Sequence, residues 1–271
     1  MRRRILAIGA ATALALSGLA LPAHAADQAQ LSVLHAVPGL TVDVYVDGER
    51  TLNNFKPGTL AGPLKLDAGT YTVAITAADA EDDSDPAIGP IDLKLAGGKN
   101  YTAVAHLEAN GDPTATLFTN DTSKTDAGQG RLTVRHVAAA PAVDVLAGGD
   151  PVVEGLENPD EASLDLDAGT IEAAVAAAGT TEPVIGPADV AVEEGVLTIA
   201  YAWGSLDDDN LKLATQTISG LHSGPGGVHA GETGLAPSGA LPGVLAALVI
   251  GLAGALLVRR SAKPVSTRST S

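Results

Sequence analysis

The stretch HAVPGLTVDVYVDG, from His35 to Gly48, decides the fold, because it returns as HVAAAPAVDVLAGG from His136 to Gly149. Two further landmarks recur in the same order: LDAGT at residues 66–70 and 166–170, and Ile-Gly-Pro at residues 88–90 and 185–187. The offset between the copies shrinks from 101 residues at the first motif to 97 at the Ile-Gly-Pro, as small length changes in loops produce. The chain therefore contains an internal duplication.

Within this stretch, the residues alternate as they do in a half-buried strand. Val42, Val44 and Val46 would lie on one face and the residues between them on the other. Asp47-Gly48 then favours a tight turn, since glycine takes a positive φ without steric strain.

These residues resemble the bacterial family called domain of unknown function (DUF) 4397. The resemblance rests on His35, Ala36, Pro38, residues 42–48, residues 66–71 and Tyr101-Thr102. The first copy fits from about Leu31 to about Asn120. The second departs from the pattern, with Ala139 for Pro38, Leu146 for Val46, Ile171 for Tyr71 and Leu197 for Tyr101. The resemblance implies secreted or surface-attached β-domains of immunoglobulin-like build, and it implies no established activity.

Composition narrows the classes of function. The chain has no cysteine, so disulfide, zinc-thiolate and thiol chemistry are excluded, and only 3% of its residues are aromatic. Readers of sugars or bases stack several rings on one face, so this content disfavours them. Between residues 26 and 240 only 9 basic residues accompany 32 acidic ones. Such a surface repels nucleic acid, and no nucleic-acid partner is expected.

The N-terminal residues 1–25 are typical of a secretory signal peptide. Arg2-Arg3-Arg4 precede an apolar run from Ile5 to Leu21, and Ala23 and Ala25 frame a cleavage site. The mature chain is expected to begin at Ala26. A membrane span is the alternative that this pattern disfavours.

The middle of the chain predicts an all-β protein of two tandem immunoglobulin-like β-sandwich domains. The first domain is expected at residues 26–122 and the second at 131–218, with a polar linker at 123–130. Strands are expected near 31–37, 41–47, 62–67, 70–77, 88–95, 100–107 and 113–119, and again near 131–138, 142–147, 163–167, 170–178, 187–192, 196–203 and 211–218. Because the joint is polar, each copy is expected to fold alone.

One segment conflicts with its local propensity. EAAVAAAG, from Glu172 to Gly179, would form a helix by composition alone. Its counterpart in the first copy, TVAITAAD, is β-branched and alternating. We therefore predict a strand in both copies.

The C-terminal part is expected to attach the protein to the cell. Residues 219–240 are rich in Gly and Pro and predict a flexible stalk, residues 241–258 a transmembrane helix, and residues 259–271 a basic cytoplasmic tail. The layout resembles a cell-wall sorting signal cut by sortases of Gram-positive actinobacteria. Its motif would be Leu235, Ala236, Pro237, Ser238 and Gly239, with Ser238 where threonine is expected. A plain membrane anchor and a sortase link to peptidoglycan both stay open.

The residues that define the repeats all favour structural roles. His35 and His136 have the parity of inward-facing residues, so a buried, hydrogen-bonded histidine is favoured over a metal ligand. Asp43 and Asp144 face away from the valines, which favours a solvated strand face or a cross-strand hydrogen bond. For Asp67 with Gly69, and Asp167 with Gly169, a hairpin turn is expected, with the glycine at positive φ. The motifs of hydrolases, zinc proteases and nucleotide-binding loops are absent.

We therefore expect no catalytic residue and no cofactor, with calcium as a minor alternative. The acidic loop at residues 79–85 and the run at 207–210 carry oxygen ligands but lack the spacing of a calcium loop. The leading hypothesis is a non-enzymatic structural, adhesion or ligand-binding module on the extracellular face of the membrane or cell wall. Its expected partners are the membrane, peptidoglycan through a sortase, and an extracellular protein or ligand. The rival hypothesis is an envelope enzyme or enzyme accessory with a His/Asp site between the repeats.

Overall fold

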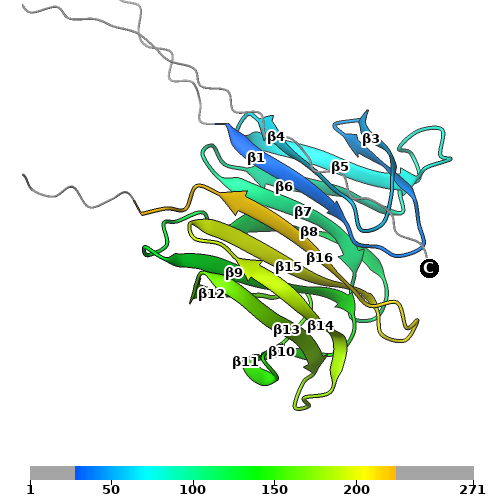
Figure 1. The fold of residues 1–271 in the computed structure, drawn as a ribbon. Helices are drawn as coiled ribbons and strands as arrows, with labels where there is room; N and C mark the ends of the chain where they lie inside the picture. The colour runs from blue at the N-terminus through cyan, green and yellow to red at the C-terminus, as the bar shows by residue number, and fades with distance from the viewer. Residues whose placement is uncertain (1–27, 224–271) are drawn as a thin grey trace, which may run out of the picture. The chain divides into compact units, whose positions relative to one another are not determined.

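The computed structural model describes residues 28–223, which form sixteen strands and, within that range, no helix (Figure 1). The first eight strands are β1 (Ala29–His35), β2 (Val42–Val46), β3 (Glu49–Phe55), β4 (Leu60–Leu66), β5 (Gly69–Ala77), β6 (Ile88–Leu95), β7 (Asn100–Leu107) and β8 (Pro113–Asn120). The other eight are β9 (Gln129–Ala139), β10 (Val143–Ala147), β11 (Asp150–Leu156), β12 (Glu161–Asp167), β13 (Gly169–Ala177), β14 (Pro183–Val192), β15 (Val196–Ser205) and β16 (Lys212–Ser219). The all-β prediction is confirmed.

The strands form four sheets, and the second pair repeats the order of the first. Strands β1 to β8 give the sheets β4-β1-β7-β8 and β3-β2-β5-β6; strands β9 to β16 give β12-β9-β15-β16 and β11-β10-β13-β14. Strand β1 pairs in parallel with β7, and β9 does the same with β15. We call residues 28–120 the first half and residues 129–219 the second half.

Each half packs its two sheets face to face, as β-sandwiches do. In the first half, valines and isoleucines of β2, β5 and β6 share a core with Ala105 and Leu107 of β7. In the second half, Val145 of β10 and Val175 of β13 pack with Leu132 and other residues of the opposite sheet. The alternation that predicted half-buried strands therefore places the apolar side chains between the sheets.

The strand order differs from that of an immunoglobulin domain. An immunoglobulin constant domain keeps its first two strands in one sheet, whereas β1 and β2 lie in different sheets here. The immunoglobulin-like prediction is therefore wrong in topology. Strand spacing predicts a sandwich but does not decide which strands pair, because pairing depends on contacts that are distant in sequence.

All fourteen expected strands are present, including the alanine-rich β13. Strands β3 and β11 were not expected. Both lie at the edge of a sheet, and most of their side chains are exposed. An edge strand needs little apolar alternation, so its sequence carries a weak signal.

The parallel pairing corrects the alignment of the two copies near their C-terminal ends. His35 pairs with Ala105, and His136 pairs with Ala202. Ala202 is therefore the counterpart of Ala105, and Leu197 is not the counterpart of Tyr101. The error is a shift of one residue, which reverses the face on which every side chain of the strand lies.

The predicted tight turn at Asp47-Gly48 is confirmed. Asp47 has φ 50° and Gly48 has φ 80°, so both take the left-handed conformation of a type I′ hairpin turn between β2 and β3. The repeated Ile-Gly-Pro also requires its glycine. Gly89 has φ 96°, and an added Cβ would lie 2.6 Å from the carbonyl oxygen of Val73.

Candidate functional site

The two halves meet along an apolar contact that we call the seam. It joins the sheet β4-β1-β7-β8 to the sheet β12-β9-β15-β16 through the faces that point away from the sandwich interiors (Figure 1). Its buried core consists of Leu34, Ala36, Val104 and Phe118 from the first half with Val137, Leu197, Ile199, Tyr201, Trp203 and Leu221. The expectation of a polar joint is therefore wrong, because the linker is polar but the faces beside it are not.

Arg135 of β9 is the charged centre of the seam, with a side chain only 1% exposed. Its Nε donates to Glu161 Oε2 at 2.7 Å, its Nη1 to the Tyr201 hydroxyl at 2.9 Å and its Nη2 to Asn120 Oδ1 at 2.8 Å. The guanidinium also lies 4.3 Å from the centre of the Phe118 ring. Since Asn120 and Phe118 belong to the first half, this one side chain ties both halves together.

Hydrogen bonds among uncharged side chains continue from Tyr201 across the seam. The Tyr201 hydroxyl donates to Gln216 Oε1 at 2.6 Å, and the Thr102 hydroxyl donates to the same oxygen at 3.0 Å. Asn120 Nδ2 donates to Asn100 Oδ1 at 2.6 Å and to Thr102 Oγ1 at 3.0 Å. Burial raises the pKa of Tyr201, so its hydroxyl stays protonated. A network of this kind fixes one arrangement of the faces that it joins.

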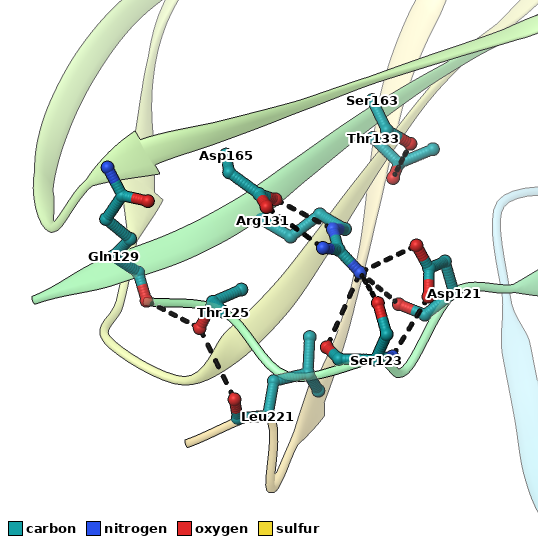
Figure 2. Close-up of polar contacts among 9 residues, drawn as sticks. All are labelled: Asp121, Ser123, Thr125, Gln129, Arg131, Thr133, Ser163, Asp165 and Leu221. Atoms are coloured by element: carbon teal, nitrogen blue, oxygen red, sulfur yellow. Dashed lines mark hydrogen bonds and ion pairs between the residues drawn. The ribbon is translucent and has the colours of Figure 1, made fainter. Parts of the chain in front are cut away.

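Arg131, four residues before Arg135 on β9, holds the segment between the halves (Figure 2). Its Nε and Nη2 donate to the two carboxylate oxygens of Asp165 at 2.7 and 2.9 Å. Its Nη1 lies 2.8 Å from Asp121 Oδ2 and donates to Ser123 Oγ at 2.8 Å. The predicted linker at 123–130 therefore starts in contact with the second half.

The C-terminal end of the described chain packs against the same linker. Thr125 N–H donates to the carbonyl oxygen of Leu221 at 2.9 Å. The Thr125 hydroxyl donates to the same oxygen at 3.4 Å, the contact drawn in Figure 2. Leu221 is buried in the seam, and Ser219 ends β16. The stalk prediction therefore does not hold for residues 219–223, while residues 224–240 lie outside the described chain.

A groove of about 440 Å³ opens beside the seam, between β16 and strands β1 and β4. None of its eleven lining residues is charged, and seven carry an amide or a hydroxyl. Ser32, Asn100 and Gln216 form its base and are each at least 92% buried. The side-chain oxygen of Gln216 already accepts two hydrogen bonds from the seam. The amide N–H groups of Gln216 are therefore the donors available to a ligand. We call this the polar groove.

A second groove, of about 390 Å³, lies where the β7–β8 turn meets Asn158-Pro159 of the second half. His106 lines it, and the Thr116 hydroxyl lies 2.9 Å from His106 Nε2. His106 Nδ1 lies 2.9 Å from the carbonyl oxygen of Leu107. The carbonyl can only accept, so Nδ1 carries the proton and Nε2 accepts from Thr116.

The two repeat-defining histidines occupy matching, closed positions. His35 Nε2 donates to the carbonyl oxygen of Leu40 at 2.7 Å, and His136 Nε2 donates to that of Pro141 at 2.9 Å. Each residue is only 1% exposed. Both histidines therefore tie the end of the first strand of a half to the loop that follows it, and neither lines a described groove.

These histidines predict a pH dependence. Burial lowers the pKa of His35, His106 and His136 below 6.5, and hydrogen bonds to backbone carbonyls offset part of this shift. As the pH falls below about 6.5, these histidines take up protons more readily in the unfolded chain than in the folded one. The free energy of unfolding therefore decreases over that pH range. We expect the three imidazole resonances to titrate with midpoints below 6.5 in an NMR titration. Midpoints at or above 6.5 would contradict this assignment.

The strand aspartates are buried, and each anchors backbone. Asp144 Oδ1 and Oδ2 accept from Gly155 N–H and Gly179 N–H, each at 2.7 Å. Asp43 Oδ1 accepts from Asn54 N–H at 2.7 Å, and Arg50 Nη1 lies 3.3 Å from its other oxygen. The hydrogen-bonded alternative is therefore confirmed, whereas the solvated strand face is wrong. These side chains point away from the valines and accept from backbone N–H groups near the ends of β3 and β11 and just after β13.

The LDAGT segments are corners between sheets, so the hairpin prediction is wrong. Strands β4 and β5 lie in different sheets, as do β12 and β13. Gly69 and Gly169 are not among the residues with positive φ. Asp67 Oδ1 instead accepts from Gln28 Nε2 at 3.1 Å, and Asp167 Oδ1 accepts from Gln129 at 3.3 Å. Each aspartate thus holds the start of its half's first strand.

The acidic segments have structural contacts of their own. In the 79–85 loop, the Glu81 carbonyl accepts from Arg50, and Asp82 Oδ1 accepts from Ser84 N–H at 3.0 Å. In the 207–210 run, Asp209 N–H donates to Leu206 O, and Asn210 Oδ1 accepts from Ser205 N–H. Within residues 28–223, no three His, Cys, Asp or Glu side chains converge to hold a metal ion.

The predicted signal peptide, transmembrane helix, tail and sorting motif (Leu235 to Gly239) lie outside the described residues. Among residues 28–223, no helix has the length and apolar character needed to cross a membrane.

The seam and its grooves were missed from the sequence. The signal that could have revealed the seam lies in the strands themselves. All residues of β7 and β15 are buried, and VLTIAYAWGS from Val196 to Ser205 is apolar at both odd and even positions. Such a run indicates burial on both faces of a sheet.

The fold and these sites describe an all-β protein whose sheets pack as β-sandwiches. Residues 29–146 contain a DUF4397 domain, described as a domain of unknown function, in agreement with the resemblance found at residues 31–120. The match covers the first half and continues through β9 and most of β10. No curated protein matches the chain significantly.

Proposed function

We propose that this protein is an exported, surface-anchored, non-enzymatic binding module of the bacterial envelope, built from two tandem DUF4397-like sandwiches. The repeated strand order supports the tandem arrangement. The buried Arg135 network supports a rigid unit in which the two halves act together. The signal-like N-terminus and the apolar C-terminal segment support export and attachment.

The observation that carries the binding function is the polar groove. It is formed by both halves, and buried amides at its base are held in place by the seam network. Prepositioned, uncharged donors and acceptors recognise neutral polar groups and discriminate against ligands that leave them unpaired. We infer a neutral ligand rich in hydroxyl or amide groups, such as a wall glycan, that binds without ring stacking.

The test uses NMR to measure whether the protein binds maltotetraose, cellotetraose or tetra-N-acetylchitotetraose. Thr217 is an exposed groove residue on edge strand β16, and Thr119 is exposed on edge strand β8 outside the groove. We expect at least one sugar to shift amide resonances around Gln216, Thr217→Arg to abolish the shifts and Thr119→Arg to leave them unchanged. No shift with any of the sugars, or equal loss in both variants, would reject the glycan proposal.

Attachment to the cell is tested separately by fractionation. The motif at residues 235–239 precedes the apolar span, so a sortase would join the Ser238 carboxyl to peptidoglycan and leave the span behind. We expect wall linkage to resist boiling detergent in the wild type and to be lost in Leu235→Ala. Complete detergent release of the wild-type protein would leave the plain single-pass anchor in its place.

The enzyme hypothesis has one observation in its favour. His106 Nε2 accepts from the Thr116 hydroxyl beside a groove between the halves, and a base next to a hydroxyl is the arrangement of an activated nucleophile. His106 is however fully buried, and its other nitrogen is bound to its own strand. Covalent labelling of Thr116 by a fluorophosphonate, lost in His106→Gln, would favour the enzyme over the module.

A further inference from the structure

A cavity of about 110 Å³ lies inside the first half, between its two sheets. Thr51 is the one polar residue among those that line it. Interiors of folded proteins are packed nearly as densely as crystals, with few voids larger than a water molecule. An apolar cavity of this size stays dry, because a water molecule inside it would lack polar partners.

The second half shows why the first has this space. Ala105 pairs with Ala115 across β7 and β8, and at the matching place in β15 and β16 Ala202 pairs with Leu213. Leu213 packs against the core of the second half, where the apolar void is only about 30 Å³. The alanine in place of leucine at residue 115 therefore helps to keep the cavity open.

The cavity has a route to solvent. Strands β3 and β4 are the edges of the two facing sheets on the same side of the sandwich. Thr51 is exposed, and Leu52, Leu64 and Leu66, which also line the cavity, are only partly buried. A small molecule can therefore enter between β3 and β4 while the contact between the two halves stays intact.

We infer that this cavity binds a small apolar molecule, or the end of an alkyl chain, as a site separate from the polar groove. Its volume approaches the ~150 Å³ of an engineered apolar cavity that binds benzene. Its one polar lining residue, Thr51, is exposed to solvent and the rest of the lining is apolar, so the cavity accepts a hydrocarbon and rejects the same molecule carrying a hydroxyl, whose hydrogen bonds would be lost. The inference does not depend on the function proposed for the groove.

The experiment measures the thermal unfolding midpoint of the full-length chain with benzene or phenol as the probe. Benzene at several times its Kd is expected to raise the midpoint of the wild-type protein by about 3 °C, and phenol is expected to leave it unchanged. Ala115→Leu, which copies the second half, is expected to abolish the benzene response. No rise with benzene, or an equal rise with phenol, would overturn the inference.

A reciprocal variant covers the case in which Ala115→Leu does not fold. Leu213→Ala should open a matching cavity in the second half, so benzene should protect this variant more than the wild type. Methyl resonances of Val33 and Ile75, which line the first cavity, should shift with benzene in the wild type. If those resonances do not move while the midpoint rises, benzene binds elsewhere and the site is rejected.

Discussion

Residues 28–122, expressed alone, are expected not to form a stable soluble monomer. The isolated first half would expose Leu34, Val104 and Phe118, which the seam buries in the whole protein. Burying an apolar side chain of this size contributes about 1.5–3 kcal/mol. Their combined loss is comparable to the ~5–15 kcal/mol that stabilises an entire domain.

This result reverses the expectation from the polar linker. The measurement is an amide NMR spectrum and a sedimentation profile of residues 28–122, with residues 28–223 as the matched control. Aggregation or a collapsed spectrum is expected for the half, and dispersed resonances for the pair. A dispersed, monomeric spectrum from residues 28–122 would show that the seam is a weak contact between independent domains.

Arg135→Ala is expected to lower the free energy of unfolding by about 3 kcal/mol or more. The substitution removes three hydrogen bonds from a fully buried guanidinium and leaves Asn120 and Tyr201 without it. Glu161 is 37% exposed and can be rehydrated, so the loss lies at the lower end for a broken buried pair. Urea denaturation measures the change.

Two further variants separate the causes. Arg135→Met keeps much of the apolar length without burying a charge and is expected to lose less stability than Arg135→Ala. Lys65→Ala removes an exposed cation of β4 and is expected to stay within about 0.5 kcal/mol of the wild type. A loss below 1 kcal/mol for Arg135→Ala would mean that the network does not hold the seam.

The sequence predicted the positions of the strands well, because alternation and turn residues are local signals. Val42 and Val44 are buried in the core and the partly buried Val46 lines the interior cavity, as expected of one strand face, and Asp47-Gly48 forms the expected turn. Alternation also placed His35 and His136 on the inner faces. It failed for the edge strands β3 and β11, whose exposure removes the apolar pattern.

Pairing and assembly could not be predicted, since they depend on residues far apart in the chain. LDAGT was compatible with a hairpin or a corner, and only the neighbours of β4 and β5 distinguish the two. The buried bonds from Arg135 to Tyr201 and from Thr102 to Gln216 span 66 and 114 residues. A buried arginine among apolar residues gave no local indication of its partners.

Native-state hydrogen exchange of the full-length chain tests most directly whether the two halves form one folding unit. The slowest amides of β5 in the first half and of β13 in the second are expected to share one opening free energy, equal to that of global unfolding. Arg135→Ala is expected to lower both by the same amount. Two distinct plateaus, with only the second half responding to the substitution, would contradict the account.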